Sequence, residues 1–152
     1  MSTNSRIIVK INKNDLGKTM VFNKKLVTPK ISDWSEYGEK PIRRRETPVE
    51  LNDNYISIYC HWDGYIKGVG NALKKCFNTY EKALNLCLGG NCSYIATDSV
   101  RRYHDRASEN PSWNLPKQAN SVKDIEFEEY TYLFENGHWK VCSDVNESFK
   151  TF

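Results

Sequence analysis

The sequence predicts an α+β fold, with an antiparallel sheet and two short helices packed on one face of that sheet. Three observations lead to this prediction: short segments of alternating apolar and polar residues, two amphipathic stretches at helical spacing, and an Asn136-Gly137 turn between aromatic segments. At 152 residues the chain is long enough for one domain with a core and too short for two. We therefore expect residues 1–152 to form a single domain.

The first strand is expected near residues 6–11, where Ile7, Val9 and Ile11 alternate with polar or exposed positions. Residues 12–54 differ in kind, because they are rich in charge and contain Pro29, Pro41 and Pro48. We interpret them as a long, loop-rich excursion after the first strand, with a short hairpin from 20–22 and 26–27 and partial order at best between 30 and 50. The run Arg43-Arg44-Arg45 fits a solvated loop better than a phosphate site.

The next strand, at 55–62, leads into the run Tyr59-Cys60-His61-Trp62-Asp63-Gly64-Tyr65. Side chains alternate between the two faces of a strand, so Cys60 and Trp62 point to the apolar face with Ile56 and Ile58. Tyr59, His61 and Asp63 then share the polar face, and Gly64 allows a sharp turn or a close backbone approach. This run is either a local core and turn structure or part of a binding site.

Helical spacing follows, with apolar residues at Val69, Leu73, Cys76 and Phe77 and then at Tyr80, Ala83, Leu84, Cys87 and Leu88. We expect two helices, at 68–77 and 79–89, that pack their apolar stripes on the sheet. The second begins at Asn78 with Glu81 three residues later, and ends at Gly89-Gly90. Gly68-Val69-Gly70 lacks the remaining residues of a dinucleotide or P-loop fingerprint.

A further strand is expected at 99–106, with Arg102, His104 and Arg106 on one face together with Val100. Arginine presents donors that match phosphate and carboxylate oxygens, so this basic stripe is a candidate anion-binding surface. The alternative is a solvent-facing strand whose arginines pair with nearby carboxylates.

The C-terminal part predicts a β-hairpin, because Asn136-Gly137 is a strong two-residue turn signal between 127–134 and 138–142. Such a turn places Phe134 opposite Trp139 and Tyr132 opposite Val141. The tail after Ser143 is expected to be frayed.

Charge and cysteine content exclude several classes of protein. The formal net charge of +3 is slight and argues against a strong nucleic-acid footprint. The five cysteines form no C-x-x-C pair, which fits thiols in a reducing cytosol better than a disulfide framework or a zinc site. No apolar signal region or membrane-length stretch occurs, so a cytoplasmic protein is expected.

The run Tyr59–Tyr65, followed by Gly68-Val69-Gly70, Leu73 and Tyr80-Glu81-Lys82, resembles a family of short uncharacterised bacteriophage and prophage proteins with a Y-x-H-W-D-G-Y motif. The similarity covers roughly 1–11 and 55–142, and includes Tyr103-His104-Asp105-Arg106 and the aromatic hairpin. Ile66 stands where the family commonly has proline, and the excursion at 12–54 is longer than usual. The resemblance implies a phage accessory protein that is made in the host cytoplasm.

These features together predict a non-enzymatic binding protein in counter-defence or host takeover, with a host protein or a nucleotide-like ligand as its partner. We expect neither a cofactor nor a resident metal. The predicted site lies where the polar face of 59–65 meets the basic stripe, and consists of Tyr59, His61, Asp63, Tyr65, Arg102, His104 and Arg106. The alternative is a metal-dependent or acid–base phosphodiesterase or nuclease that uses His61, Asp63 and His104. Direct nucleic-acid binding is less favoured because the net charge is small.

Overall fold

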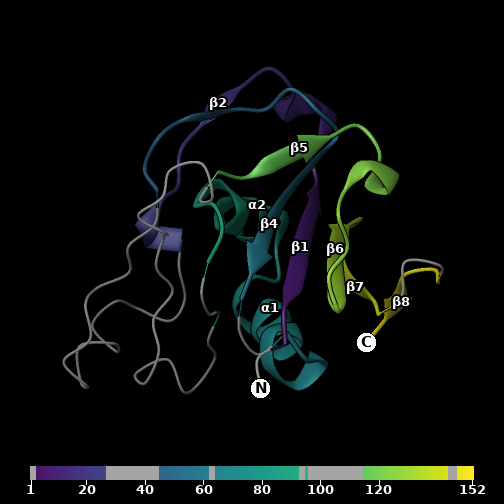
Figure 1. Cartoon of the computed structure of the whole chain (residues 1–152). Helices are drawn as coiled ribbons and strands as arrows, with labels where there is room; N and C mark the ends of the chain where they lie inside the picture. The colour runs from purple at the N-terminus through teal and green to yellow at the C-terminus, as the bar shows by residue number, and fades with distance from the viewer. Residues whose placement is uncertain (1–2, 27–44, 62–63, 93–94, 96–114, 144–146) are drawn as a thin grey trace, which may run out of the picture.

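A computed structural model describes residues 3–26, 45–61, 64–92, 95, 115–143 and 147–152. The prediction of an α+β fold is confirmed: within these residues, a six-stranded sheet is packed against two α-helices (Figure 1). The strand order across the sheet is β5-β4-β1-β6-β7-β8. In chain order these strands are β1 (Ser5–Lys10), β4 (Tyr55–Cys60), β5 (Lys117–Ala119), β6 (Tyr130–Glu135), β7 (His138–Cys142) and β8 (Lys150–Thr151).

The sheet is mixed, so the prediction of an antiparallel sheet is wrong for one pair of strands. β1 pairs antiparallel with β4, in a register that places Ile7 opposite Ile58, but it pairs parallel with β6, where Ile7 lies opposite Tyr132. No tight turn joins β1 to β6, because they come from opposite ends of the chain. Their relative direction is therefore set by packing rather than by local turn chemistry.

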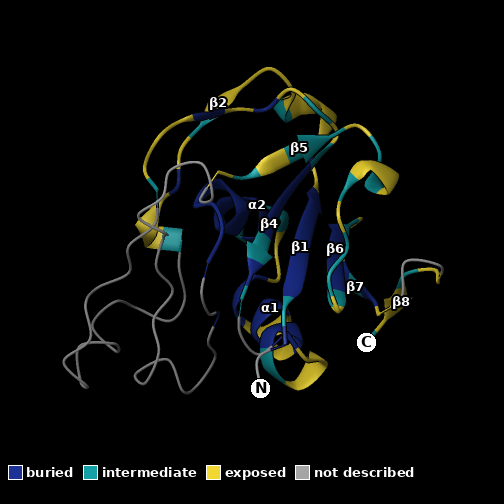
Figure 2. Cartoon of the chain, in the orientation of Figure 1, coloured by how far each residue is buried: buried dark blue, intermediate teal, exposed yellow. Residues whose placement is uncertain are grey.

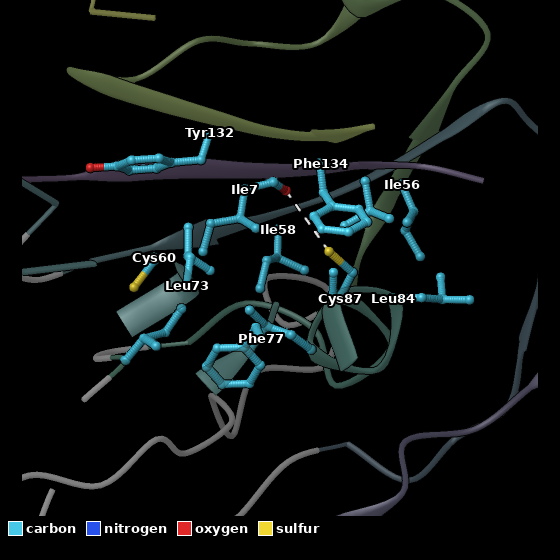
Figure 3. Close-up of a cluster of buried hydrophobic side chains, with 14 of the residues drawn as sticks. Ile7, Ile56, Ile58, Cys60, Leu73, Phe77, Leu84, Cys87, Tyr132 and Phe134 are labelled. Atoms are coloured by element: carbon cyan, nitrogen blue, oxygen red, sulfur yellow. Dashed lines mark hydrogen bonds between the residues drawn. The ribbon is translucent and has the colours of Figure 1, made fainter. Parts of the chain in front are cut away.

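The central strand β1 is buried on both faces, and its residues Ser5 to Val9 are all buried (Figure 2). Ile7 and Val9 point toward the helices and belong to the main hydrophobic core, which β4 joins through Ile56, Ile58 and Cys60. Figure 3 shows the side chains of Ile7, Ile56, Ile58 and Cys60 between the strands and the helices. Ile8 is also fully buried, on the other side of the sheet, which we call the outer face. The predicted alternation is confirmed for the helix-facing side, but the outer face of β1 is less polar than expected.

Both predicted helices are present, with modified ends. A single π-helical turn (Ile66–Gly70) precedes α1 (Asn71–Cys76), and α2 covers Tyr80–Leu88. The N-cap of α2 is Thr79 rather than Asn78, and its side-chain oxygen accepts a hydrogen bond from the Lys82 amide. Both helices contribute side chains to the core that faces the sheet (Figure 3).

The C-terminal hairpin forms as predicted, with Phe134 opposite Trp139 and Tyr132 opposite Val141. Asn136 and Gly137 have φ angles of 53° and 81°, which a tight hairpin turn with both central residues at positive φ requires. The expectation of a frayed tail after Ser143 is wrong for the last residues, because β8 pairs with β7. The Phe152 ring also packs against Tyr132, with ring centroids 5.6 Å apart.

The two ends of the excursion are tied together and to the core. β2 (Thr19–Met20) pairs with β3 (Val49–Glu50), so the predicted hairpin between 20–22 and 26–27 is wrong. Phe22, Val49 and Leu51 belong to the core cluster. Alternating apolar residues identify a strand here but not its partner, which lies beyond the prolines of the intervening segment. Residues 27–44 lie outside the described part of the chain.

The five cysteines all lie in the described ranges; each is buried, and none forms a disulfide. No helix in the described part of the chain is long and apolar enough to cross a membrane. The predicted strand at 99–106 and the predicted core position of Trp62 fall outside the described residues.

Candidate functional site

The end of β4 is held between two backbone partners. On one side it pairs with β1, and on the other side the Cys92 amide donates to the Tyr59 carbonyl at 3.0 Å while the His61 amide donates to the Cys92 carbonyl at 3.1 Å. The Asn91 side chain completes this edge by accepting from the Tyr59 amide at 2.7 Å. The backbone that carries the predicted site is therefore fixed by the sheet rather than by a loop.

Tyr59 and His61 share the outer face, as predicted, because Ile58 and Cys60 fill the core on the opposite side. The Tyr59 Oη lies 3.2 Å from Nδ1 of His61, and the two ring centroids are 6.1 Å apart. Both side chains are half-buried. A histidine whose Nδ1 is engaged in this way has a fixed ring orientation, which suits either recognition or proton transfer.

Arg6 lies directly beside Tyr59 on this face, and it was missing from the predicted site. Its Nε donates to the Glu126 carbonyl at 3.0 Å, and its guanidinium carbon lies 5.8 Å from the centroid of the Tyr59 ring. A guanidinium nitrogen lies 3.9 Å from Oε2 of Glu128. Arg6 is only 5% exposed. An arginine directly beside the apolar run Ile7-Ile8-Val9 was the signal that could have identified it.

Burial dominates the electrostatics of this cluster. It lowers the pKa of Arg6, and the nearby Glu128 carboxylate opposes that change. Burial also raises the pKa of Tyr59 and the pKa of Glu128. The guanidinium therefore acts as a buried link between β1 and the segment 126–128, stabilised by a carbonyl, a carboxylate and an aromatic face.

Gly64 is held by two backbone hydrogen bonds and lies close to the backbone before β1. Its amide donates to the Thr3 carbonyl at 2.8 Å, and its carbonyl accepts a 2.6 Å hydrogen bond from the Tyr132 hydroxyl. A Cβ at this position would lie 2.8 Å from the Asn4 carbonyl oxygen. The sequence-based expectation of a close backbone approach at Gly64 is thus confirmed.

Tyr65 lies on the helix-facing side of the sheet, apart from Tyr59 and His61. Its ring meets the Tyr130 ring edge-on, with centroids 5.7 Å apart, and Tyr130 packs against the main core. Together with Ile66, Lys67 and Gly68, the two tyrosines line an open groove of about 490 Å³. We call this the Tyr65 groove.

The structure therefore brings together only some of the predicted site residues. Tyr59 and His61 form one cluster with Arg6, and Tyr65 belongs to a separate groove. Asp63, Arg102, His104 and Arg106 lie outside the described residues. Sequence reasoning missed Ile66, Lys67 and Tyr130 as neighbours of Tyr65. Adjacency along the chain could have suggested the first two, but Tyr130 comes from the distant strand β6.

Comparisons with known proteins give no match: no protein-family model, curated protein or solved structure is similar to this chain. Within the described ranges, no group of three or more histidine, cysteine, aspartate or glutamate side chains is arranged to hold a metal ion.

Proposed function

We propose that this chain is a phage-encoded, non-enzymatic binding protein that serves counter-defence or host takeover by acting on a host protein. A nucleotide signal is the other partner class that the sequence predicts. The phage setting rests on the resemblance of residues 59–65 and the segments after them to short phage proteins. The binding role rests on the surface around Tyr65.

The observation that carries the binding role is the exposure of two large apolar side chains side by side at this groove. Tyr65 is 45% exposed and Ile66 is 38% exposed, although Val69 and Gly70, just beyond them, are buried. Tyrosine is enriched among residues that dominate the binding energy of protein interfaces, since it offers a large rigid surface at a small entropy cost. An exposed pair of this kind on a well-packed support favours a protein partner.

A pull-down from infected-host lysate with quantitative mass spectrometry tests this proposal. The parent chain is compared with Tyr65→Ser and with Val21→Ser as a matched control, because Val21 is 46% exposed and is absent from the groove lining. A host protein that is retained by the parent and by Val21→Ser, but lost with Tyr65→Ser, supports the proposal. Identical captures by all three proteins would refute a role for this surface.

The alternative function, phosphodiester cleavage with His61, Asp63 and His104, has one favourable observation. The Tyr59 hydroxyl holds the His61 ring at Nδ1, and a fixed imidazole is a common acid or base. Incubation of the parent and His61→Ala with nucleotides and single-stranded nucleic acid, with and without Mg²⁺ or Mn²⁺, tests it. Cleavage of a substrate by the parent that is abolished in His61→Ala would show that the protein is an enzyme rather than a binding protein.

A further inference from the structure

We propose that the Tyr65 groove binds an acidic peptide segment of the partner, which packs one aromatic or aliphatic side chain against Tyr65 and Tyr130. This inference rests on the proposed binding function and specifies the chemistry of the partner. Three properties of the groove carry it: a rigid support, an ammonium group that no carboxylate in the described part of the chain neutralises, and backbone donors that are already occupied.

The support of the groove is rigid. The amides of Gly68 and Gly70 both donate to the Tyr65 carbonyl, at 3.0 and 3.2 Å, so the backbone of Tyr65 is fixed by the turn that follows it. A Cβ at Gly70 would lie 3.1 Å from the Phe152 ring and 3.2 Å from the Tyr132 hydroxyl oxygen. A partner therefore meets a preformed surface, which lowers the entropy cost of binding.

The charge at the groove is positive. Lys67 is the charged residue in its lining, and within the described part of the chain it has no carboxylate partner. Lys74, on α1, donates to the Phe152 carbonyl and lies 5.0 Å from the centroid of the Phe152 ring. Glu129, beside Tyr130, accepts a hydrogen bond from the Asn4 amide at 3.4 Å. Since no carboxylate among the described residues pairs with the Lys67 ammonium group, the groove favours a partner that supplies carboxylates next to its apolar anchor.

The occupied backbone donors favour a peptide over a nucleotide. Phosphate sites usually present several backbone amides or arginine forks, and here the amides of Gly68 and Gly70 are already bonded to the Tyr65 carbonyl. An open groove of about 490 Å³ can hold a large side chain with the adjoining backbone. The chemistry that fits is therefore an apolar residue flanked by aspartate or glutamate.

Selection from a random 12-residue peptide display library against the full chain tests this inference. We expect the enriched peptides to share a tryptophan, phenylalanine or leucine flanked by acidic residues. Their affinity is then measured by fluorescence anisotropy for the parent, Tyr65→Ser, Ile66→Ser and Lys67→Glu, with Lys13→Glu as a charge-matched control. Lys13 is exposed and lines a different pocket, beside Tyr80 and Asn136.

The expected result is a loss of at least about tenfold with Tyr65→Ser, Ile66→Ser and Lys67→Glu, an unchanged affinity with Lys13→Glu, and weaker binding as salt increases. Thermal melts that match the parent show that each variant is folded. Enriched peptides that are basic or uncharged, or that bind Tyr65→Ser as well as the parent, would overturn the inference. Displacement of the peptide by ATP would do the same, because it would assign the groove to a nucleotide.

This outcome is separable from the proposed function. If Tyr65 is needed to capture a host protein but the selected peptides are neutral or basic, the binding function is supported and the acidic segment is refuted. If acidic peptides bind at Tyr65 but no host protein is captured in a Tyr65-dependent way, the groove chemistry is supported and the host-protein role is refuted.

Discussion

The hydroxyl of Tyr132 donates a 2.6 Å hydrogen bond to the backbone carbonyl of Gly64. The bond joins the middle of β6 to Gly64, and both residues are buried. Since the Gly64 amide also donates to the Thr3 carbonyl, Gly64 is held between the residues just before β1 and the core side of β6. These two bonds fix the backbone immediately before Tyr65.

Gly64→Ala should destabilise the protein by about 1–3 kcal/mol, because the added Cβ would lie 2.8 Å from the Asn4 carbonyl oxygen and 2.9 Å from its carbon. Chemical denaturation followed by tryptophan fluorescence measures the effect. Gly17→Ala is the comparison: nothing lies within 4 Å of an added Cβ there, and its φ of 88° alone costs about 1–2 kcal/mol. A Gly64→Ala variant as stable as the parent would contradict the close approach.

Asn85→Ala should detach the start of the excursion from α2. The Asn85 Oδ1 accepts from the Asn23 amide at 2.7 Å, and its Nδ2 donates to the Asn23 carbonyl at 2.9 Å. Asn85 is 4% exposed, so loss of both bonds leaves backbone groups poorly satisfied and costs about 2 kcal/mol. Hydrogen exchange should accelerate at Asn23, whereas Asn78→Ala, an exposed control, should leave that amide protected.

Tyr80→Phe should make the free energy of unfolding less dependent on pH in the acid range. The Tyr80 hydroxyl donates to Oδ2 of Asp15 at 2.7 Å, and this bond is the main cause of the lowered pKa of Asp15. A carboxyl whose folded pKa is below its unfolded value stabilises the fold above the unfolded pKa, and this contribution disappears as pH falls through the folded pKa.

Tyr80→Phe should therefore lose roughly 1 kcal/mol at neutral pH, and the difference from the parent should shrink below about pH 4. Urea denaturation between pH 2.5 and 7 measures it, with Tyr55→Phe as a control on β4. A difference that stays constant across this range would show that the hydroxyl acts independently of the Asp15 charge.

All five cysteines should resist thiol reagents in the folded protein, because all are buried and a thiol must reach the reagent as a thiolate. Titration with a chromogenic disulfide should detect little fast-reacting thiol under native conditions and five thiols per chain in guanidinium chloride. Rapid native reaction at one position, located by peptide mapping, would reveal a local opening at that cysteine.

Sequence patterns predicted those elements that are determined by residues close together in the chain. Asn136-Gly137 specified both a turn and the register that pairs Phe134 with Trp139, because a two-residue turn leaves one alignment. The spacing of apolar residues placed both helices, with end errors of a few residues where the π-helical turn and the Thr79 cap replaced a regular start.

Non-local pairing was not predictable from the same patterns. The alternation in β1 does not reveal that β6 is its parallel neighbour, nor that Met20 pairs with Val49 across the excursion. For the site, alternation placed Tyr59 and His61 on one face correctly. Alternation could not predict the path of the chain beyond Gly64, where the Tyr65 ring packs against Tyr130. Arg6 was missed because its partners at 126–128 are remote in sequence.

The position of β1 between β4 and β6 has a consequence for the order of events during synthesis. β1 leaves the ribosome before β6, so the edge of β1 that pairs with β6 has its partner only after residues 130–135 are made. At about 5–20 residues per second this delay is on the order of ten seconds. Through that interval the nascent chain carries an apolar strand edge, a risk for self-association in the crowded cell, so the yield of folded protein should respond to chaperone supply.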